Sequence, residues 1–291
     1  MKAVTLFLMT KKGFSLLGDI VDTYRTLIEQ VVVGADPALD CDYFDQIVSL
    51  CEAHGIPWCR RSADHTIRSP YAMAVGWRWM IDHPEDRLIV FHDSLLPRYR
   101  GFNPLVTALI NGDREAGVTA LLGAQEYDAG PVLAQARVTL NYPVTISAAI
   151  DLLRTAYREC AYAVLSLLID GKPLHGIAQD EALASYSLWR DEDDYLVPWK
   201  QSAAWLQRFV DALGSPYRGA ACTVNGTPAR LLEVQALPDV TIANRDPGKV
   251  LRMQGNYPVV VCGEGLLEIR GLVDDHGTSL LPLTRFRTRF G

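Results

Sequence analysis

The 291-residue sequence has no apolar run long enough to cross a membrane. Its hydrophobic stretches fall far short of the ~18–20 residues that a spanning helix needs, which argues against an integral membrane protein. The amino-terminal stretch MKAVTLFLMTKK is apolar, but it lacks a small-residue cleavage site and alternates like a strand. No signal peptide is therefore expected, and a cytoplasmic protein is indicated.

Positive charge is not in excess either. The chain has 28 Lys+Arg against 34 Asp+Glu, a net charge of −6. A nucleic-acid binder usually carries a basic domain or stripe, so this balance disfavours nucleic acid as a partner. Six cysteines without regular spacing are typical of reduced thiols. Cys51, His54, Cys59 and His65 fit no usual zinc-ligand spacing, so no metal site is predicted.

Three catalytic signatures are also missing. No G-x-G-x-x-G follows a predicted strand and no G-x-x-x-x-G-K-(S/T) is present, which leaves dinucleotide and P-loop functions without support. No G-x-S-x-G elbow is present, so a serine hydrolase is not indicated.

Strand and helix patterns alternate over residues 1–177. Helical periodicity covers residues 14–30 and 43–55, and a long helix is predicted from an N-cap at Thr145 to Gly171. Alternation of this kind is typical of an α/β domain with a parallel or mixed sheet covered on both faces.

The pattern changes after about residue 178. Residues 1–180 are predicted to form one domain, 181–199 a polar and aromatic linker, and 200–291 a smaller, mainly β domain of short strands. In the last of these strands Arg285, Arg287 and Arg289 fall on one side. This pattern favours an exposed edge protected by charge over a phosphate contact.

The most informative stretch is LIVFHDSLLPRYRGFNP, residues 88–104. A branched strand runs directly into His92, and ligands of open α/β sheets bind beyond the carboxyl ends of strands. His92 is thus a candidate general base, with a hydrogen-bonded structural histidine as the alternative. Asp128, in the turn EYDAGPV, is either a carboxylate that orients His92 or a turn residue before Gly130.

The ordered pieces HDSLLPRYRG, INGDREAGVT and DAG resemble the folate-dependent formyltransferases, which include tRNA and amino-sugar enzymes. The resemblance implies a Rossmann-like catalytic domain with a mainly parallel sheet and a C-terminal OB-like barrel. It implies N10-formyltetrahydrofolate as formyl donor and His92 and Asp128 as catalytic residues.

The resemblance also implies a folate pocket and an acceptor site. The residues carried over for folate are Trp77, Arg78, Trp79, Met80, Gln125, Glu126 and Tyr127. Trp77 and Trp79 have core packing as the alternative. Ser94, Arg98 and Asn103 are the expected contacts with the acceptor substrate.

One position departs from the family. Val90 stands where the family has an Asn two residues before the His, on the same side of the strand. Loss of one oxyanion donor costs about 10²–10³-fold in rate in other enzymes. Protonated His92, Ser94, Asn103 or a backbone N–H is then needed as donor; otherwise the protein is slow or only binds its ligands.

The acceptor that the charge balance favours is a nucleotide-linked amino sugar, as in lipopolysaccharide biosynthesis. Residues 185–291 contain as many basic as acidic residues, whereas a tRNA enzyme needs a positive surface. Methionyl-tRNA, an amino-acid or siderophore precursor, and a non-catalytic binding role stay as alternatives. A homodimer is left open.

Overall fold

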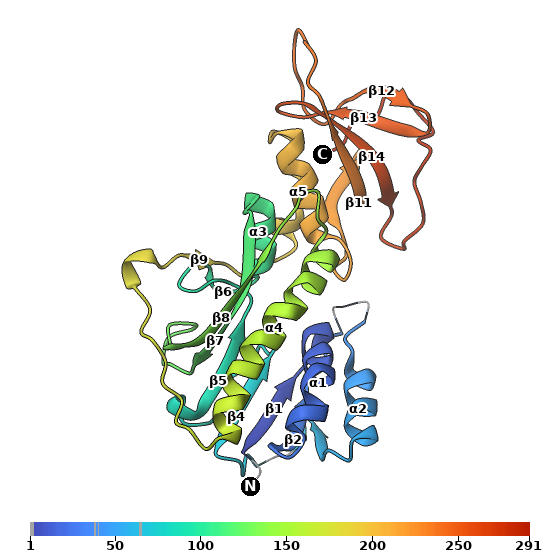
Figure 1. Ribbon diagram of the computed structural model, residues 1–291. Helices are drawn as coiled ribbons and strands as arrows, with labels where there is room; N and C mark the ends of the chain where they lie inside the picture. The colour runs from blue at the N-terminus through green and yellow to red at the C-terminus, as the bar shows by residue number, and fades with distance from the viewer. Residues whose placement is uncertain (1–2, 38, 40, 64–65) are drawn as a thin grey trace. The chain divides into compact units, whose positions relative to one another are not determined.

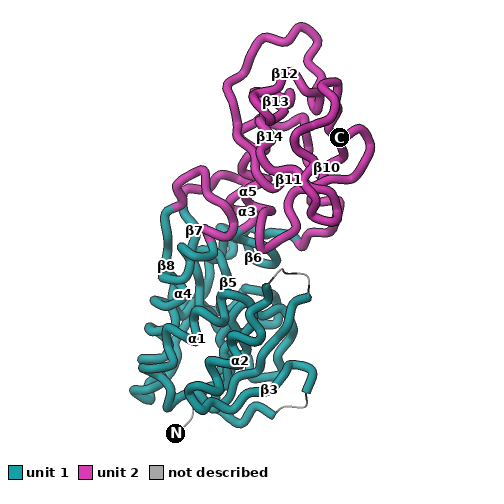
Figure 2. Tube along the Cα trace, turned by 90° about the vertical axis from the view of Figure 1, so that its right-hand side faces the viewer, with its two compact units in different colours: residues 1–105, 115–139, 150–188 teal, residues 106–114, 140–149, 189–291 magenta. Residues whose placement is uncertain are grey.

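The computed structural model describes residues 3–37, 39, 41–63 and 66–291 (Figure 1). His65 lies outside the described residues. The chain divides into two compact units, coloured separately in Figure 2. The first unit contains residues 1–105, 115–139 and 150–188, and the second contains 106–114, 140–149 and 189–291. The last change of unit falls within the predicted linker 181–199.

The first unit is built on a seven-stranded sheet with the order β3-β2-β1-β4-β5-β7-β8. The first five strands in this order are parallel, and β7 and β8 run antiparallel to their neighbours. The strands are β1 (Val4–Leu8), β2 (Ile28–Val33), β3 (Trp58–Arg60), β4 (Tyr71–Val75), β5 (Leu88–His92), β7 (Glu115–Leu122) and β8 (Val132–Thr139). The predicted mainly parallel sheet is confirmed.

Three helices lie in front of the sheet in Figure 1: α1 (Thr10–Tyr24), α2 (Phe44–Ala53) and α4 (Ile146–Ile169). Helix α1 lies between the other two, and the Tyr24 hydroxyl is 2.8 Å from that of Ser166 on α4. Of the helices in the described ranges, none combines the length and apolarity needed to cross a membrane.

The predicted helix over residues 14–30 is too long. Helix α1 ends at Tyr24, and Ile28 already pairs with Val4 at the start of β2. The apolar residues of this segment fit a helical period, but burial beside β1 favours the extended form. Helix α3 (Pro104–Asn111) was not predicted.

The sheet buries apolar side chains on both of its faces. Every residue of β1 is buried. Leu8 packs towards α1, where a side chain on Gly13 would meet it. Phe7 points the opposite way, because side chains alternate along a strand, and forms a cluster with Val32 and Ala74. Trp77, in the loop after β4, packs against that cluster.

The second unit contains a five-stranded antiparallel sheet with the order β10-β11-β14-β13-β12, and helix α5 contacts it. The predicted mainly β domain is thus confirmed. The elements are α5 (Ala203–Leu213), β10 (Ala220–Val224), β11 (Thr227–Leu237), β12 (Val250–Gln254), β13 (Tyr257–Val261) and β14 (Leu266–Val273). Ser202 caps α5 by accepting a hydrogen bond from the Trp205 N–H at 3.3 Å.

The carboxyl-terminal segment joins the two edges of this sheet. The Thr223 N–H donates to the Gly291 carbonyl at 2.7 Å, and the Phe290 N–H donates to the Gly248 carbonyl at 2.7 Å. Arg289 pairs with Asp246 at 2.5 Å. The prediction of an exposed, charge-protected edge at 285–289 is therefore wrong for Arg289, because backbone pairing uses both sides of its strand.

The described part of the chain also contains five short elements. They are the strands β6 (Arg100–Gly101) and β9 (Tyr186–Ser187) and the 3-10 turns at Glu85–Arg87, Glu181–Leu183 and Asp193–Tyr195. Strands β6 and β9 pair in parallel and bring residues 186–187 beside the segment that follows His92.

Candidate active site

His92 is the last residue of β5 and only 8% of it is exposed. Its Nε2 is 2.7 Å from the backbone carbonyl of Tyr99, in the loop that follows the strand. A carbonyl only accepts hydrogen bonds, so Nε2 carries a proton and the neutral ring presents a lone pair at Nδ1. The fold thus selects Nδ1 as the nitrogen that takes up a proton.

Asp128 faces that nitrogen. Its Oδ1 is 3.4 Å from His92 Nδ1, and its Oδ2 accepts a hydrogen bond from the Gly101 N–H at 2.8 Å. Asp128 has a φ of +57°, a left-handed conformation that Asp tolerates better than most residues. A side chain on Gly130 would lie 1.9 Å from the Leu122 carbonyl, so only glycine fits there. The DAG sequence therefore presents the carboxylate to His92.

Side chains of β7 and β8 hold the loop after His92 by hydrogen bonds to its backbone. The hydroxyl of the fully buried Thr119 donates to the Ser94 carbonyl at 2.6 Å and accepts from the Leu96 N–H at 3.2 Å. Gln135 donates to the Leu96 carbonyl at 3.0 Å. Sequence reasoning assigned no role to Thr119 or Gln135, although GVT was part of the motif.

The three predicted acceptor contacts differ in their surroundings. Ser94 is buried, and its hydroxyl donates to the Arg98 carbonyl at 2.7 Å, which shapes the loop. Arg98 is exposed, with its guanidinium over the Tyr99 ring. Asn103 has a φ of +49°, and its side chain makes no hydrogen bond to the described residues.

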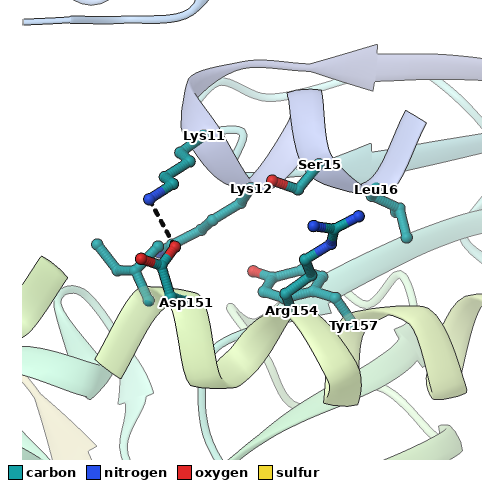
Figure 3. Close-up of a pocket in the computed structure, with 8 residues that line it drawn as sticks. Lys11, Lys12, Ser15, Leu16, Asp151, Arg154 and Tyr157 are labelled. Atoms are coloured by element: carbon teal, nitrogen blue, oxygen red, sulfur yellow. Dashed lines mark ion pairs between the residues drawn. The ribbon is translucent and has the colours of Figure 1, made fainter. Parts of the chain in front are cut away.

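A second group of charged residues lies on the α1–α4 side of the first unit (Figure 3). Lys12 and Tyr157 both donate to the Asp93 carboxylate, directly after His92. Burial, together with this carboxylate, holds the pKa of Tyr157 well above its usual value, so the phenol stays a donor. Lys11 pairs with Asp151 at 2.5 Å. Lys11 and Lys12 are thus already paired with carboxylates of the protein. The hollow between α1 and α4 is therefore a poor site for an anion.

The segment expected to hold the pterin ring has an unusual backbone. Among the described residues, the peptide groups of 77–82 make no hydrogen bond to other protein atoms. Unpaired donors and acceptors in a row suit a flat heterocycle that carries both. The Nε1 of Trp77 is buried and also without a partner among the described residues.

The side chains of this segment are partly used for packing. Trp77 and Trp79 contact each other edge to face, with ring centres 5.1 Å apart, and Arg78 pairs with Asp36 at 2.9 Å. Met80 is 78% exposed. The indole rings therefore act mainly as a support for the backbone that they carry.

The second predicted folate segment lies in the β7–β8 connection. Gln125, Glu126 and Tyr127 are exposed, directly before Asp128. The Tyr127 ring lies 6.2 Å from that of Phe102, next to Gly101. The β4–β5 and β7–β8 connections come close to each other at Gly123, where a side chain would meet the backbone of Glu85. The unpaired peptide groups of 77–82 and the exposed side chains of 125–127 have the chemistry to contact a folate.

Val90 lies beside His92 on β5, two residues earlier and on the same side of the strand. It pairs in register with Ala74 of β4 and Leu121 of β7. Its side chain supplies volume but no hydrogen-bond donor.

Comparisons with known proteins identify the family of this chain. Residues 71–165 match the family described as formyl transferase, and residues 190–284 match the formyl transferase C-terminal domain. The chain belongs to the formyl transferase family. The first match contains both His92 and Asp128.

Curated relatives in this formyl transferase family include two methionyl-tRNA formyltransferases. The protein from Granulibacter bethesdensis is 36% identical over 65% of this chain and 57% of its own length. That from Thiobacillus denitrificans is 35% identical over 71% of this chain and 65% of its own length. The match therefore spans less than two thirds of either relative.

Solved structures share the fold of the chain. An N-formyltransferase from Helicobacter canadensis, in complex with folinic acid and dTDP-3-aminofucose, has a TM-score of 0.71 at 12% identity and covers 93% of this chain and 99% of its own. HypX from Aquifex aeolicus has a TM-score of 0.62 at 20% identity and covers 94% of this chain and 44% of its own.

Proposed function

We propose that this protein transfers a formyl group from N10-formyltetrahydrofolate to a primary amine, in the cytoplasm. The observation that carries the proposal is the His92–Asp128 pair, with Nε2 of His92 engaged by the Tyr99 carbonyl and Nδ1 facing the carboxylate. The folate donor supplies an activated formyl group. The free peptide groups of 77–82 and the exposed loop 125–127 are proposed to hold it.

His92 acts as general base in this reaction. The attacking amine must be neutral, and it releases a proton as its nitrogen bonds to the formyl carbon. Nδ1 of His92 takes this proton and later returns it to the departing folate nitrogen. Asp128, 3.4 Å away, stabilises the positive charge on the ring between these steps.

The charge that develops on the formyl oxygen needs a donor, which Val90 does not supply. Asn103 is the proposed donor. Its amide makes no hydrogen bond to the described part of the chain, whereas the Ser94 hydroxyl is engaged by the Arg98 carbonyl. Arg98 is exposed and suits a contact with a phosphate of the acceptor.

The proposed acceptor is a nucleotide-linked amino sugar. Support comes from the charges of the second unit, where several arginines are already paired with carboxylates, such as Arg245 with Asp239 at 2.5 Å and Arg230 with Glu192 at 2.8 Å. A polyanion such as tRNA needs an uncompensated positive surface. Methionyl-tRNA is the second candidate because the curated relatives at 35–36% identity carry that activity in their names.

The test offers the purified protein N10-formyltetrahydrofolate with one amine at a time and detects formylated product by mass spectrometry. The panel contains nucleotide-linked 3-amino and 4-amino sugars, ornithine derivatives and initiator methionyl-tRNA. We expect a formylated sugar that His92→Asn abolishes without loss of folding. Product only with methionyl-tRNA would replace the acceptor, and activity retained in His92→Asn would remove the mechanism.

Tight folate binding without any product would favour a binding protein instead. Val90→Asn is the variant for that case, because it restores an amide donor beside His92. Formyl transfer gained by Val90→Asn alone would show that valine at this position is what suppresses catalysis.

A further inference from the structure

A buried arginine lies just behind the candidate site. Arg100 is 1% exposed, and its guanidinium hydrogen-bonds to side chains other than those proposed to react. It makes a two-pronged contact with Glu181, at 2.7 and 2.8 Å, and donates to Gln179 Oε1 from Nε and Nη2 at 3.1 and 2.9 Å. Burying a charge is costly unless it is paired, and all three guanidinium nitrogens of Arg100 donate to these two side chains.

Gln179 connects Arg100 to the site. Its Nε2 donates to the carbonyls of Asp128 at 2.7 Å and Gly130 at 2.8 Å. The two ends of an amide differ, since one only accepts and the other only donates. Because Arg100 holds the oxygen, the nitrogen has to face the two carbonyls. Arg100 thus decides which way the Gln179 amide points.

The two carbonyls frame the turn that presents the catalytic carboxylate. Asp128 has a φ of +57°, a conformation that non-glycine residues adopt only where their surroundings hold it. Gln179 bridges the turn through its carbonyls, and the Gly101 N–H binds the carboxylate itself. Gly101 is the chain neighbour of Arg100. Strand β6 therefore contacts the Asp128 side chain through Gly101 and the Asp128 backbone, by way of Gln179, through Arg100.

We propose that Arg100 and Gln179 are positioning residues that set the contact between Asp128 and His92. The proposal rests on the function proposed above. Gln179 is the residue that transmits the effect, and Arg100 acts by fixing the Gln179 amide. Glu181 pairs with Arg100 from the solvent side, where its own side chain is 68% exposed, so its replacement has a smaller effect.

A double-mutant cycle tests this proposal. Gln179→Met is made in the wild-type chain and in Asp128→Asn, and kcat and KM are measured for the acceptor that the amine panel identifies. We expect Gln179→Met to lower kcat about tenfold to a hundredfold in the wild type, with KM nearly unchanged. In Asp128→Asn it lowers kcat less than about threefold, because a residue that acts through Asp128 has nothing further to lose.

Gln179→Glu is a second variant that distinguishes loss of positioning from loss of folding. It keeps an acceptor for Arg100 but turns a carboxylate oxygen towards the two carbonyls, so it breaks only the link to Asp128. Gln46→Met, on the exposed side of α2, is the matched control and should leave kcat unchanged. Equal losses from Gln179→Met in both backgrounds would overturn the positioning role.

A spectroscopic measurement separates this proposal from the proposed function. The imidazole resonances of His92, recorded by NMR with isotope-labelled histidine, should change in the same direction in Gln179→Glu and in Asp128→Asn. If the wild type transfers no formyl group to any amine, the proposed function fails, but these spectra still decide whether Gln179 controls the His92–Asp128 contact. Unchanged His92 resonances in Gln179→Glu would refute the inference.

Discussion

The two units of this protein use their charged residues in opposite ways. In the first unit Arg100 is buried and paired so that, through Gln179, it acts on Asp128, whose carboxylate stays directed at His92. In the second unit Arg289 and Lys249 share the exposed carboxylate of Asp246, at 2.5 and 2.8 Å, beside the strands that the terminal segment joins.

This difference teaches how to recognise a site from its pairing pattern. A carboxylate that accepts from two cations is satisfied and serves structure. Asp128 instead accepts from one backbone N–H and faces a histidine ring, so part of its charge remains available to a transient cation. Substitutions that disturb Asp128 should therefore reduce turnover, and those that disturb Asp246 should change stability alone.

The largest effect is expected from Asp128→Asn. The amide keeps the shape of the side chain but removes the negative charge that stabilises protonated His92, so kcat should fall about 10³–10⁴-fold. Folate affinity should change little, and calorimetry with the wild type and the variant checks this. A fall in binding equal to the fall in kcat would mean that Asp128 contacts the donor instead.

Thr119→Val should have an intermediate effect. The substitution keeps the shape of a fully buried residue but leaves the Leu96 N–H and the Ser94 carbonyl without their partner. A buried group left unsatisfied costs about 1–3 kcal/mol. Both the free energy of unfolding and kcat should decrease, since the loop that holds His92 Nε2 loosens. Chemical denaturation and steady-state kinetics on the same preparation measure the two effects.

Asp211→Asn should change stability and not turnover. Burial raises the pKa of Asp211 in α5 from 3.8 to about 6, with Glu233 adding to this and Gln207 opposing it. The folded state therefore holds the proton more tightly than the unfolded state. Stability conferred by this group falls as the pH rises from about 4 to about 6, and the cost persists at neutral pH.

The asparagine variant removes that cost. Its unfolding temperature should exceed that of the wild type by a few degrees above about pH 6, and the difference should disappear near pH 4. Equal unfolding temperatures at neutral pH would show that water reaches this carboxylate in solution.

The smallest effect is expected from Arg289→Met. The side chains of Arg289 and Asp246 are about half exposed, so solvent screens their attraction. The pKa of Asp246 is lowered to about 2, first by Arg289 and then by Lys249. The stability that this pair provides is present above about pH 4 and is lost as the pH falls towards 2. Turnover at neutral pH should be unchanged, and a marked loss would place Arg289 in the acceptor site.

Much of the fold was predictable because periodicity and caps are local properties. The strand that leads into His92 and the long helix after Thr145 lie where the sequence indicated. The error at residues 28–30 arose because a short apolar segment fits a helix as well as a buried strand, and only pairing with β1 decides between them.

The residues of the candidate site were also predicted only in part. His92 and Asp128 were found from their motif, and the structure brings them within 3.4 Å. Thr119, Gln135 and Gln179 were not found, because each acts through a backbone group of a distant segment. Hydrogen bonds of this kind leave no spacing or periodicity in the sequence.

The sequence by itself determined the family, the two side chains proposed as catalytic and the mixed composition of helices and strands. It does so because local conformational preferences and side-chain chemistry are carried by each residue and its near neighbours. The tertiary structure alone decided which nitrogen of His92 faces Asp128, which way the Gln179 amide points and how the last strand is paired. These features depend on contacts between segments that only the folded chain brings together.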